Sequence, residues 1–151
     1  MTASPSSQRP LGVALVGLGF GEKVHLPALQ DCPLTEPIAL WHHRSERLEQ
    51  ACAATGLPGF NSFEALLADP RVDALVIATP PEPRFALAQA AISAGKHLLL
   101  EKPVALEAPQ IEALQRQALS AGVTVAVDFE YRAVPAFMQL AALLEQNAIG
   151  T

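Results

Sequence analysis

The chain has 151 residues, of which half are apolar and 17% are charged. This composition can form one hydrophobic core and excludes a wholly disordered protein. Ten Lys and Arg residues against fifteen Asp and Glu residues give a formal net charge of −5, which argues against a nucleic-acid binder or a binder of anionic membranes, because both need a basic face.

Cysteine content and hydropathy limit the cellular context. Cys32 and Cys52 are the two cysteines of the chain, too few for a disulfide framework or a cysteine-rich zinc site. We interpret them as reduced thiols, which favours a cytoplasmic location. No apolar run approaches the roughly 18 residues of a membrane span. The apolar stretch 11–20 contains three glycines and leads into Glu22 and Lys23, so it does not predict a signal peptide.

Short apolar runs alternate with amphipathic stretches along most of the chain. Residues 1–10 predict a disordered tail, residues 11–147 one domain, and residues 148–151 the start of a link to a further domain. The apolar runs are rich in Val, Leu and Ile on both faces, as in parallel strands that are covered on both sides. The predicted strands span residues 13–16, 38–41, 59–60, 74–78, 97–100 and 123–127.

The stretches between the predicted strands have apolar residues at helical spacing. Asn61 and Glu64 form a capping pair that indicates the start of one helix. In the last helix an apolar stripe, from Phe137 to Leu144, predicts packing partly within this domain and partly against another. Besides a helix after the glycine-rich turn at residues 17–21, the predicted helices span residues 45–55, 61–68, 82–94, 107–121 and 135–146.

Alternating strands and helices predict an α/β fold, a doubly wound parallel sheet of the dinucleotide-binding Rossmann type. Ligands of such sheets bind beyond the carboxyl ends of the strands. The residues that follow each strand are therefore the candidates for a functional site.

The turn after the first strand is rich in glycine. Gly17, Gly19, Phe20 and Gly21 precede a helix, where glycines let backbone N–H groups approach a pyrophosphate. The third glycine of the full fingerprint is replaced by Glu22. The pattern favours a dinucleotide site, and the alternative is an ordinary turn between a strand and a helix.

The turn after the second strand lacks an acidic residue. An Asp or Glu usually binds the ribose hydroxyls of NAD at this position, but residues 38–45 contain neither. Arg44 and Ser45 could contact a 2′-phosphate and His43 could stack on adenine, so we favour NADP over NAD. The alternative is a solvated loop in which Ser45 caps the next helix. His42 and His43 have no nearby third ligand, and we expect no metal site.

Further candidate site residues, most of them polar, follow the last three predicted strands. Two charges at the rim of an apolar strand carry a desolvation cost unless they are paired or used. The alternatives are a strand-ending turn after the first of these strands and solvated charged loops after the other two. The residues are Thr79 and Pro80, then Glu101 and Lys102, then Asp128, Glu130, Tyr131 and Arg132.

Four segments together resemble the Gfo/Idh/MocA family of NAD(P)-dependent oxidoreductases. They are VGLGFG at 16–21, VHLPAL at 24–29, VIATPP at 76–81 and AGKHLLLEKP at 94–103, and the likeness extends over residues 11–149. The resemblance implies an N-terminal Rossmann domain that binds the nicotinamide cofactor. It also implies a C-terminal α/β domain that covers a sugar, inositol or related polyol substrate and mediates homo-oligomerisation.

The resemblance implies hydride transfer assisted by Lys102, next to the nicotinamide and the substrate hydroxyl. It places Arg84 where many members have His near the nicotinamide and Glu130 where many have Asn. The family's downstream Asp and His have no counterpart in this chain. We therefore expect a cofactor-binding lobe, either excised or truncated, that is inactive alone. A non-catalytic nucleotide-binding or sensor module is the alternative, and a methyltransferase is disfavoured by the Glu-Lys-Pro sequence.

Overall fold

A computed structural model describes residues 9–148 of the chain. Residues 1–8 and 149–151, and with them most of the predicted tail and of the predicted link, lie outside the described part. Arg9 belongs to the predicted tail, but its guanidinium lies 2.7 Å from the carboxylate of Asp73. The same carboxylate accepts a hydrogen bond from Gly12 N, so Arg9 is fixed to the sheet by this ion pair.

The core of the fold is one six-stranded sheet in which all neighbouring strands are parallel. The strand order is β3-β2-β1-β4-β5-β6, so the direction of winding reverses between β1 and β4. This confirms the predicted doubly wound α/β fold and places the switch point next to the glycine turn. The strands are β1 (Leu11–Val16), β2 (Thr35–Trp41), β3 (Gly59–Phe60), β4 (Ala74–Ile77), β5 (His97–Glu101) and β6 (Val125–Asp128).

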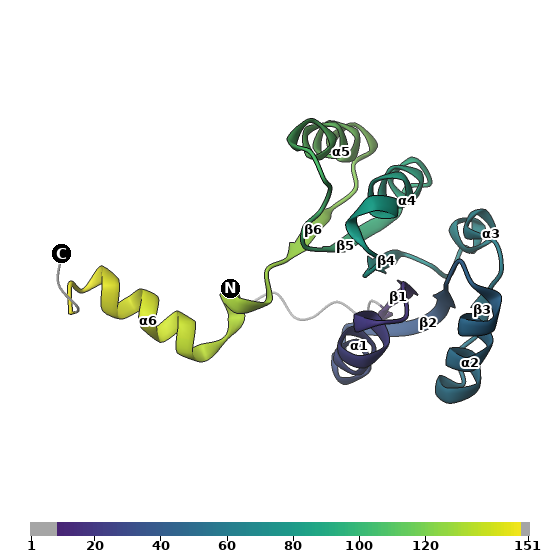
Figure 1. The fold of residues 1–151 in the computed structure, drawn as a ribbon, viewed down its shortest axis with the longest axis horizontal. Coiled ribbons are helices and arrows are strands. Elements are labelled where there is room, and N and C mark those ends of the chain that lie inside the picture. Colours follow the sequence, from purple (N-terminus) through teal and green to yellow (C-terminus); the bar gives the residue numbers. More distant parts are fainter. Residues whose placement is uncertain (1–8, 149–151) are drawn as a thin grey trace.

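Helices cover both faces of the sheet (Figure 1). One apolar cluster joins the sheet to α1 and α2, and the other joins it to α3, α4 and α5. The last helix, α6, does not belong to either layer. The helical segments are η1 (Gly21–His25, a π-helix), α1 (Leu26–Asp31), α2 (Ser45–Thr55), α3 (Phe63–Ala68), α4 (Pro81–Ser93), α5 (Ala108–Ala121), η2 (Glu130–Ala133, a 3₁₀ turn) and α6 (Pro135–Glu145).

One predicted helix cap needs correction, and one predicted helix start is confirmed. Ser62, not Asn61, caps α3, because its hydroxyl accepts a hydrogen bond from Ala65 N at 3.2 Å. Ser45 is the first residue of α2, as predicted; the alternative in which Ser45 caps this helix is wrong, because Arg44 holds the capping position and its side chain makes no capping hydrogen bond. Within residues 9–148 no helix is both long enough and apolar enough to cross a bilayer.

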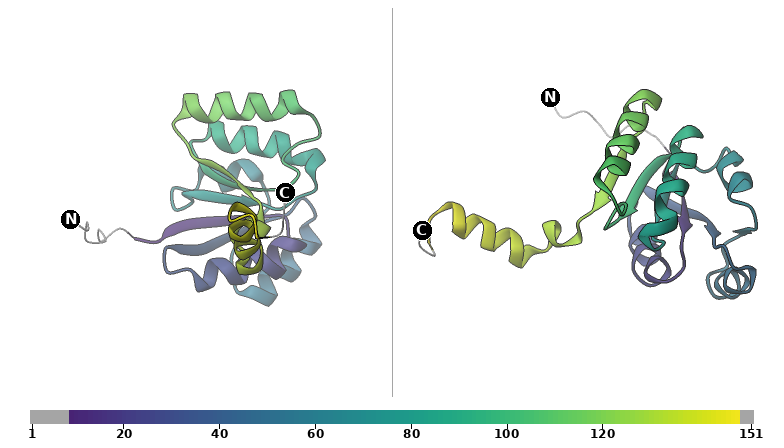
Figure 2. Two further views of the ribbon diagram at one scale, coloured as in Figure 1. Left: turned by 90° about the vertical axis from the view of Figure 1, so that its left-hand side faces the viewer. Right: turned by 45° about the horizontal axis from the view of Figure 1, so that its top comes forward.

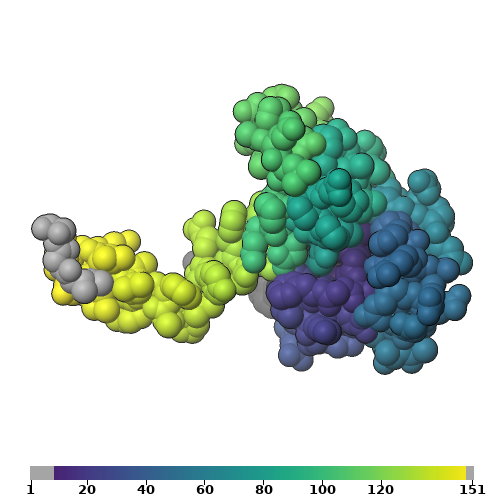
Figure 3. Space-filling view, viewed as in Figure 1, coloured from purple at the N-terminus to yellow at the C-terminus, as the bar shows by residue number. Residues whose placement is uncertain are grey.

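Helix α6 does not pack within the domain, contrary to the prediction from its apolar stripe. It extends away from the sheet and its helices, as the ribbon and space-filling views show (Figures 1–3). None of its residues is buried, and Phe137 and Leu144 are 50% and 55% exposed. An apolar stripe predicts a buried face but not the partner that buries it, and no described part of this chain covers α6.

Candidate functional site

A groove opens at the switch point of the sheet, beyond the carboxyl ends of β1, β2 and β4. Its volume is about 630 Å³, within the usual range for a small-molecule or cofactor site. We call it the β1–β4 groove. It brings together six of the residues predicted for cofactor binding, namely Gly17, Gly19, His43, Arg44, Thr79 and Pro80.

The glycine turn forms one wall of the β1–β4 groove for two different reasons. Gly17 has φ +97°, and a Cβ on it would lie 2.8–2.9 Å from the backbone of Ala78 and Thr79. No other residue type fits there without displacing the chain. A Cβ on Gly19 would meet nothing within 4 Å, so the backbone of Gly19 faces open space that a ligand could enter.

The lining of the groove also carries cationic side chains. Lys23, Arg44 and Arg47 line the β1–β4 groove, and of the described residues that line it none is Asp or Glu. His42 and His43 stack with their ring centroids 4.4 Å apart. Burial, followed by the neighbouring His43, lowers the pKa of His42. This lining suits an anionic ligand that carries a flat ring.

Thr79 provides a polar group that the protein itself does not use. Its side chain is buried at the wall of the β1–β4 groove, and its hydroxyl has no hydrogen-bond partner among the described residues. A buried hydroxyl without a partner carries a desolvation cost. A ligand in the groove that hydrogen-bonds to Thr79 would remove this cost.

Glu22, which replaces the third glycine of the fingerprint, pairs with Arg47. The Arg47 guanidinium donates both to the Glu22 carboxylate and, at 2.8 Å, to the carbonyl of Leu18. The substitution therefore attaches the glycine turn to α2 by an ion pair. Arg47 was not predicted as part of the site, because its partner Glu22 lies 25 positions away in the chain.

Eight residues predicted to bind cofactor do not line the β1–β4 groove, and three of these eight follow β1 or β2 in the chain. Gly21 is buried, with the Leu15 side chain 3.0 Å from where its Cβ would lie. Phe20 is half exposed and sets its ring edge against His25 at 5.4 Å. Ser45 is exposed in the first turn of α2. Gly21 thus has a packing role, because the start of η1 approaches β1 closely.

Arg84 occupies a different place from the one expected of it. Its guanidinium is buried and donates hydrogen bonds to three carbonyl oxygens, which belong to Thr79, Glu101 and Pro103. Burial lowers the pKa of Arg84. The hydrogen bonds join the loop after β4 to the loop after β5, and Arg84 lines neither pocket described here. Arg84 therefore has a structural role here, in place of the cofactor contact that was expected of it.

Lys102, Glu130 and Arg132 line a second cavity, which we call the β5–β6 pocket. Its volume is about 790 Å³, and its other walls are mostly apolar. The Lys102 Nζ atom lies 2.9 Å from a carboxylate oxygen of Glu130. This hydrogen bond and charge raise the pKa of Lys102 and lower that of Glu130. Both pockets lie at the carboxyl edge of the sheet, because they follow the ends of parallel strands.

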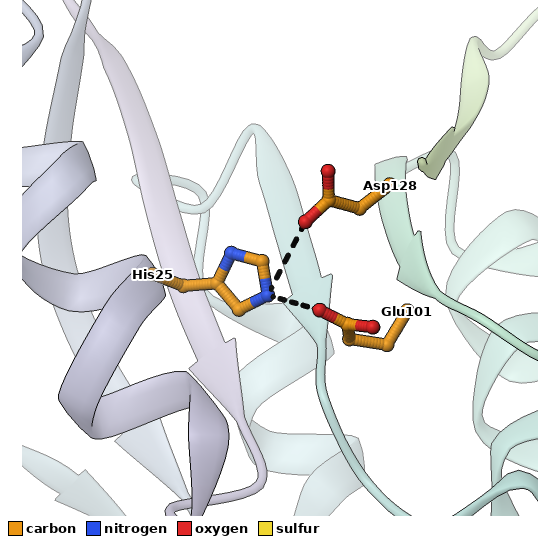
Figure 4. Close-up of side chains that lie close together, drawn as sticks. All are labelled: His25, Glu101 and Asp128. Atoms are coloured by element: carbon orange, nitrogen blue, oxygen red, sulfur yellow. Dashed lines mark hydrogen bonds and ion pairs between the residues drawn. The ribbon is translucent and has the colours of Figure 1, made fainter. Parts of the chain in front are cut away.

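A cluster of His25, Glu101 and Asp128, of which the first two are buried and Asp128 is partly exposed, lies at the same edge (Figure 4). His25 Nε2 is 2.9 Å from Glu101 Oε1 and 3.8 Å from Asp128 Oδ2. Glu101 Oε2 accepts a hydrogen bond from the backbone N–H of Lys102 at 3.1 Å. Burial, opposed by His25, raises the pKa of Asp128.

His25 was not predicted from the sequence as part of the site. The available signal was its position between Val24 and Leu26, which makes it a polar residue in an apolar stretch. The decisive feature is the π-helical turn η1, which ends at His25. Such turns shift the direction of the side chains that follow them and often occur at functional sites.

Comparison with known proteins agrees with this geometry. The sequence profile of an oxidoreductase family with an NAD-binding Rossmann fold matches residues 11–129. The chain belongs to the Gfo/Idh/MocA oxidoreductase family. The match covers β1 to β6 and ends before α6.

Relatives of this family are longer than the chain. An uncharacterised oxidoreductase of Synechocystis sp. is 42% identical over 99% of this chain and 40% of its own length. D-apiose dehydrogenase of Paraburkholderia graminis is 31% identical over the whole chain and 40% of its own length. The crystal structure of KijD10, a 3-ketoreductase from Actinomadura kijaniata in complex with TDP-benzene and NADP, superposes with a TM-score of 0.87. It is 31% identical, and the match covers 93% of this chain and 45% of that chain.

Proposed function

We propose that this chain is the cofactor-binding lobe of an oxidoreductase and holds a nicotinamide dinucleotide in the β1–β4 groove. The observation that carries the proposal is the combination of a glycine turn and cationic side chains in the lining of one groove. The open backbone at Gly19 admits a pyrophosphate, and Lys23 supplies positive charge in the same lining. The charge of Arg47, by contrast, is paired with that of Glu22. The free hydroxyl of Thr79 offers the ligand a further hydrogen bond.

The proposal extends to a preference for NADP. The turn after β2 presents Arg44 to the β1–β4 groove, and no described lining residue is acidic. A guanidinium pairs with a phosphate, whereas an acidic residue there would repel it and bind ribose hydroxyls. The stacked rings of His42 and His43 offer an apolar face for adenine. The NADP present in the KijD10 structure supports this preference.

The proposed reaction is hydride transfer between the cofactor and a carbon that bears a hydroxyl or carbonyl group. The cofactor supplies the hydride chemistry, and this chain supplies Lys102 beside the reacting oxygen. The pairing of Lys102 with Glu130 keeps the amine protonated. A protonated amine polarises the substrate oxygen and can donate a proton to it. Sugars or related polyols are the proposed substrates, supported by the sugar-modifying relatives.

The remaining proposals concern cellular context and partners. Cys32 and Cys52 are free, which supports a reducing compartment such as the cytoplasm. The exposed apolar side chains of α6 are surface that a further domain or a second copy could cover, and a homo-oligomer is proposed for the whole enzyme from its family. The net charge of −5 argues against nucleic acid or an anionic membrane as a partner.

Calorimetric titration of this chain with NADP and with NAD tests the proposal. We expect one site per chain and tighter binding of NADP. Absence of binding for both would contradict the cofactor site. A whole enzyme that binds NADP but oxidises and reduces no sugar or polyol would instead favour a non-catalytic nucleotide-binding module.

A further inference from the structure

We propose that His25 is a positioning residue that holds the turn carrying Lys102 through the carboxylate of Glu101. This inference rests on the proposed role of Lys102 in hydride transfer. His25 follows the glycine turn in the chain, at the end of η1, whereas Glu101 ends β5. The contact between them therefore joins the cofactor-binding turn to the proposed catalytic turn.

Both carboxylate oxygens of Glu101 are occupied. One oxygen lies 2.9 Å from Nε2 of His25, and the other accepts the backbone N–H of Lys102 at 3.1 Å. Glu101 is 7% exposed and His25 6%. In such surroundings a hydrogen bond to a carboxylate is stronger than at the surface. His25 thus fixes the orientation of the Glu101 carboxylate, and the carboxylate in turn holds the backbone N–H of Lys102.

The cluster of His25, Glu101 and Asp128 needs a hydrogen-bond donor. Glu101 and Asp128 occupy paired positions on the neighbouring parallel strands β5 and β6. Two carboxylates side by side repel each other when both are ionised. Figure 4 shows the ring of His25 directed from η1 toward both carboxylates. An N–H on Nε2 offsets the repulsion and keeps Glu101 in the position that holds Lys102.

The same three side chains could be considered as metal ligands, since their donor atoms lie within 4.8 Å of one another. The hydrogen-bond distance between His25 and Glu101 favours the positioning role, because a metal ion would have to separate these two atoms. Zinc binding is therefore an outcome that the experiment must be able to detect.

The first experiment uses the 151-residue chain and follows the amide proton of Lys102 by NMR. His25→Leu removes the hydrogen-bond donor to Glu101. We expect the chemical shift of the Lys102 amide proton to move toward that of an amide with a weaker hydrogen bond. His25→Gln retains an N–H, and we expect it to keep the resonance near the wild-type position. If His25→Leu does not fold, His25→Asn replaces it, because it is polar but too short to reach Glu101.

His97→Gln is the matched control. His97 is exposed at the start of β5 and accepts a hydrogen bond from Thr124 N at 3.0 Å, far in register from Glu101. We expect this variant to leave the Lys102 resonance unchanged. An unchanged resonance in His25→Leu or His25→Asn would overturn the proposal. So would stoichiometric binding of Zn²⁺ to the wild-type chain that His25→Gln abolishes.

The second experiment measures kcat and the Kd for NADP in the whole enzyme. We expect His25→Leu or His25→Asn to lower kcat by about 10- to 100-fold, because Lys102 is then misplaced. The same variants should change the Kd for NADP by less than about twofold. His25→Gln should retain most of the wild-type kcat. Equal losses in the Gln and Leu variants would overturn the positioning role. If wild-type protein does not bind NADP, the proposed function fails, but the NMR result still decides the link from His25 to Lys102.

Discussion

The ammonium group of Lys102 lies 2.9 Å from the carboxylate of Glu130, across the opening between the end of β5 and the turn η2. Both side chains are partly exposed, so this is a surface ion pair whose side chains can rearrange, and not a buried one. The hydrogen bond from Lys102 raises its own pKa and lowers that of Glu130. The amine is therefore held in its charged form at the carboxyl edge of the sheet, where a substrate oxygen would need a cation.

Replacement of Lys102 tests its role in the reaction. In the whole enzyme we expect Lys102→Ala to lower kcat by about 10²-fold or more, because general acid assistance acts in the transition state. The Kd for NADP measured by calorimetry should change little. Arg116→Ala is the control, since Arg116 is exposed on α5. Retention of wild-type kcat in Lys102→Ala would remove this residue from the mechanism.

Glu130→Gln tests the electrostatic part of this arrangement. The hydrogen bond and charge of Glu130 raise the pKa of Lys102 above its usual value. Without that charge the pKa falls, so the ammonium group is lost at a lower pH. We expect the alkaline limb of the pH profile of kcat to move to lower pH in the variant. Glu112→Gln, on the exposed face of α5, should leave the profile unchanged, and an unmoved limb in Glu130→Gln would contradict the account.

Two glycines of the same turn should respond differently to alanine. Gly17→Ala introduces a Cβ at φ +97° against the backbone of Thr79, and we expect a loss of about 1–3 kcal/mol in the free energy of unfolding. Gly19→Ala meets no atom within 4 Å and should leave stability unchanged. Because its Cβ would occupy space meant for the ligand, we expect the Kd for NADP to rise about tenfold.

Urea unfolding and calorimetric titration check this pair of variants. Each glycine serves as the control for the other, since one change acts on folding and the other on binding. Equal stability of the two variants, or wild-type affinity in Gly19→Ala, would show that the turn does not have the proposed role.

Arg44 should set the preference between the two cofactors. A hydrogen bond to a charged group contributes about 1.5–3 kcal/mol, so we expect Arg44→Ala to weaken NADP binding by about 10- to 100-fold. The affinity for NAD, which lacks the 2′-phosphate, should stay within a small factor of the wild-type value. Isothermal titration of both cofactors gives the ratio. Equal weakening of NAD and NADP would assign Arg44 to a contact other than the 2′-phosphate.

Helix α6 should cause self-association of this chain. Phe137, Met138 and Leu144 are at least 50% exposed, and contiguous apolar surface favours association. We expect sedimentation experiments to detect oligomers at high concentration. The double variant Phe137→Glu with Leu144→Lys should reduce them, and the control Gln139→Glu, on the same helix, should not. A wild-type chain that remains monomeric at high concentration would contradict this prediction.

The sequence was sufficient to predict the sheet and its functional edge. Apolar runs on both faces indicated parallel strands, and the glycines after the first strand indicated the switch point, where the β1–β4 groove is found. These features depend on short segments of the chain. Local patterns of hydropathy and turn residues are enough to define them.

Features that depend on distant residues were not predictable in this way. Arg84 resembled a cofactor ligand, but carbonyl groups from two other loops surround it. The π-helical turn η1 places His25 against Glu101, and the spacing of apolar residues does not predict such a turn. The stripe of α6 indicated an apolar face but could not show that this domain leaves it uncovered. For Arg84 and His25 the partners lie far away in the chain.

The central claim is that the β1–β4 groove holds a nicotinamide dinucleotide. Titration of the ¹⁵N-labelled chain with NADP, followed by NMR, tests it most directly. We expect saturable shifts of the backbone amides of Gly17, Gly19 and Thr79, with little change at the amino ends of the strands, for example at Lys96. Saturable shifts confined to residues outside the β1–β4 groove, or no shifts at millimolar NADP, would contradict the claim.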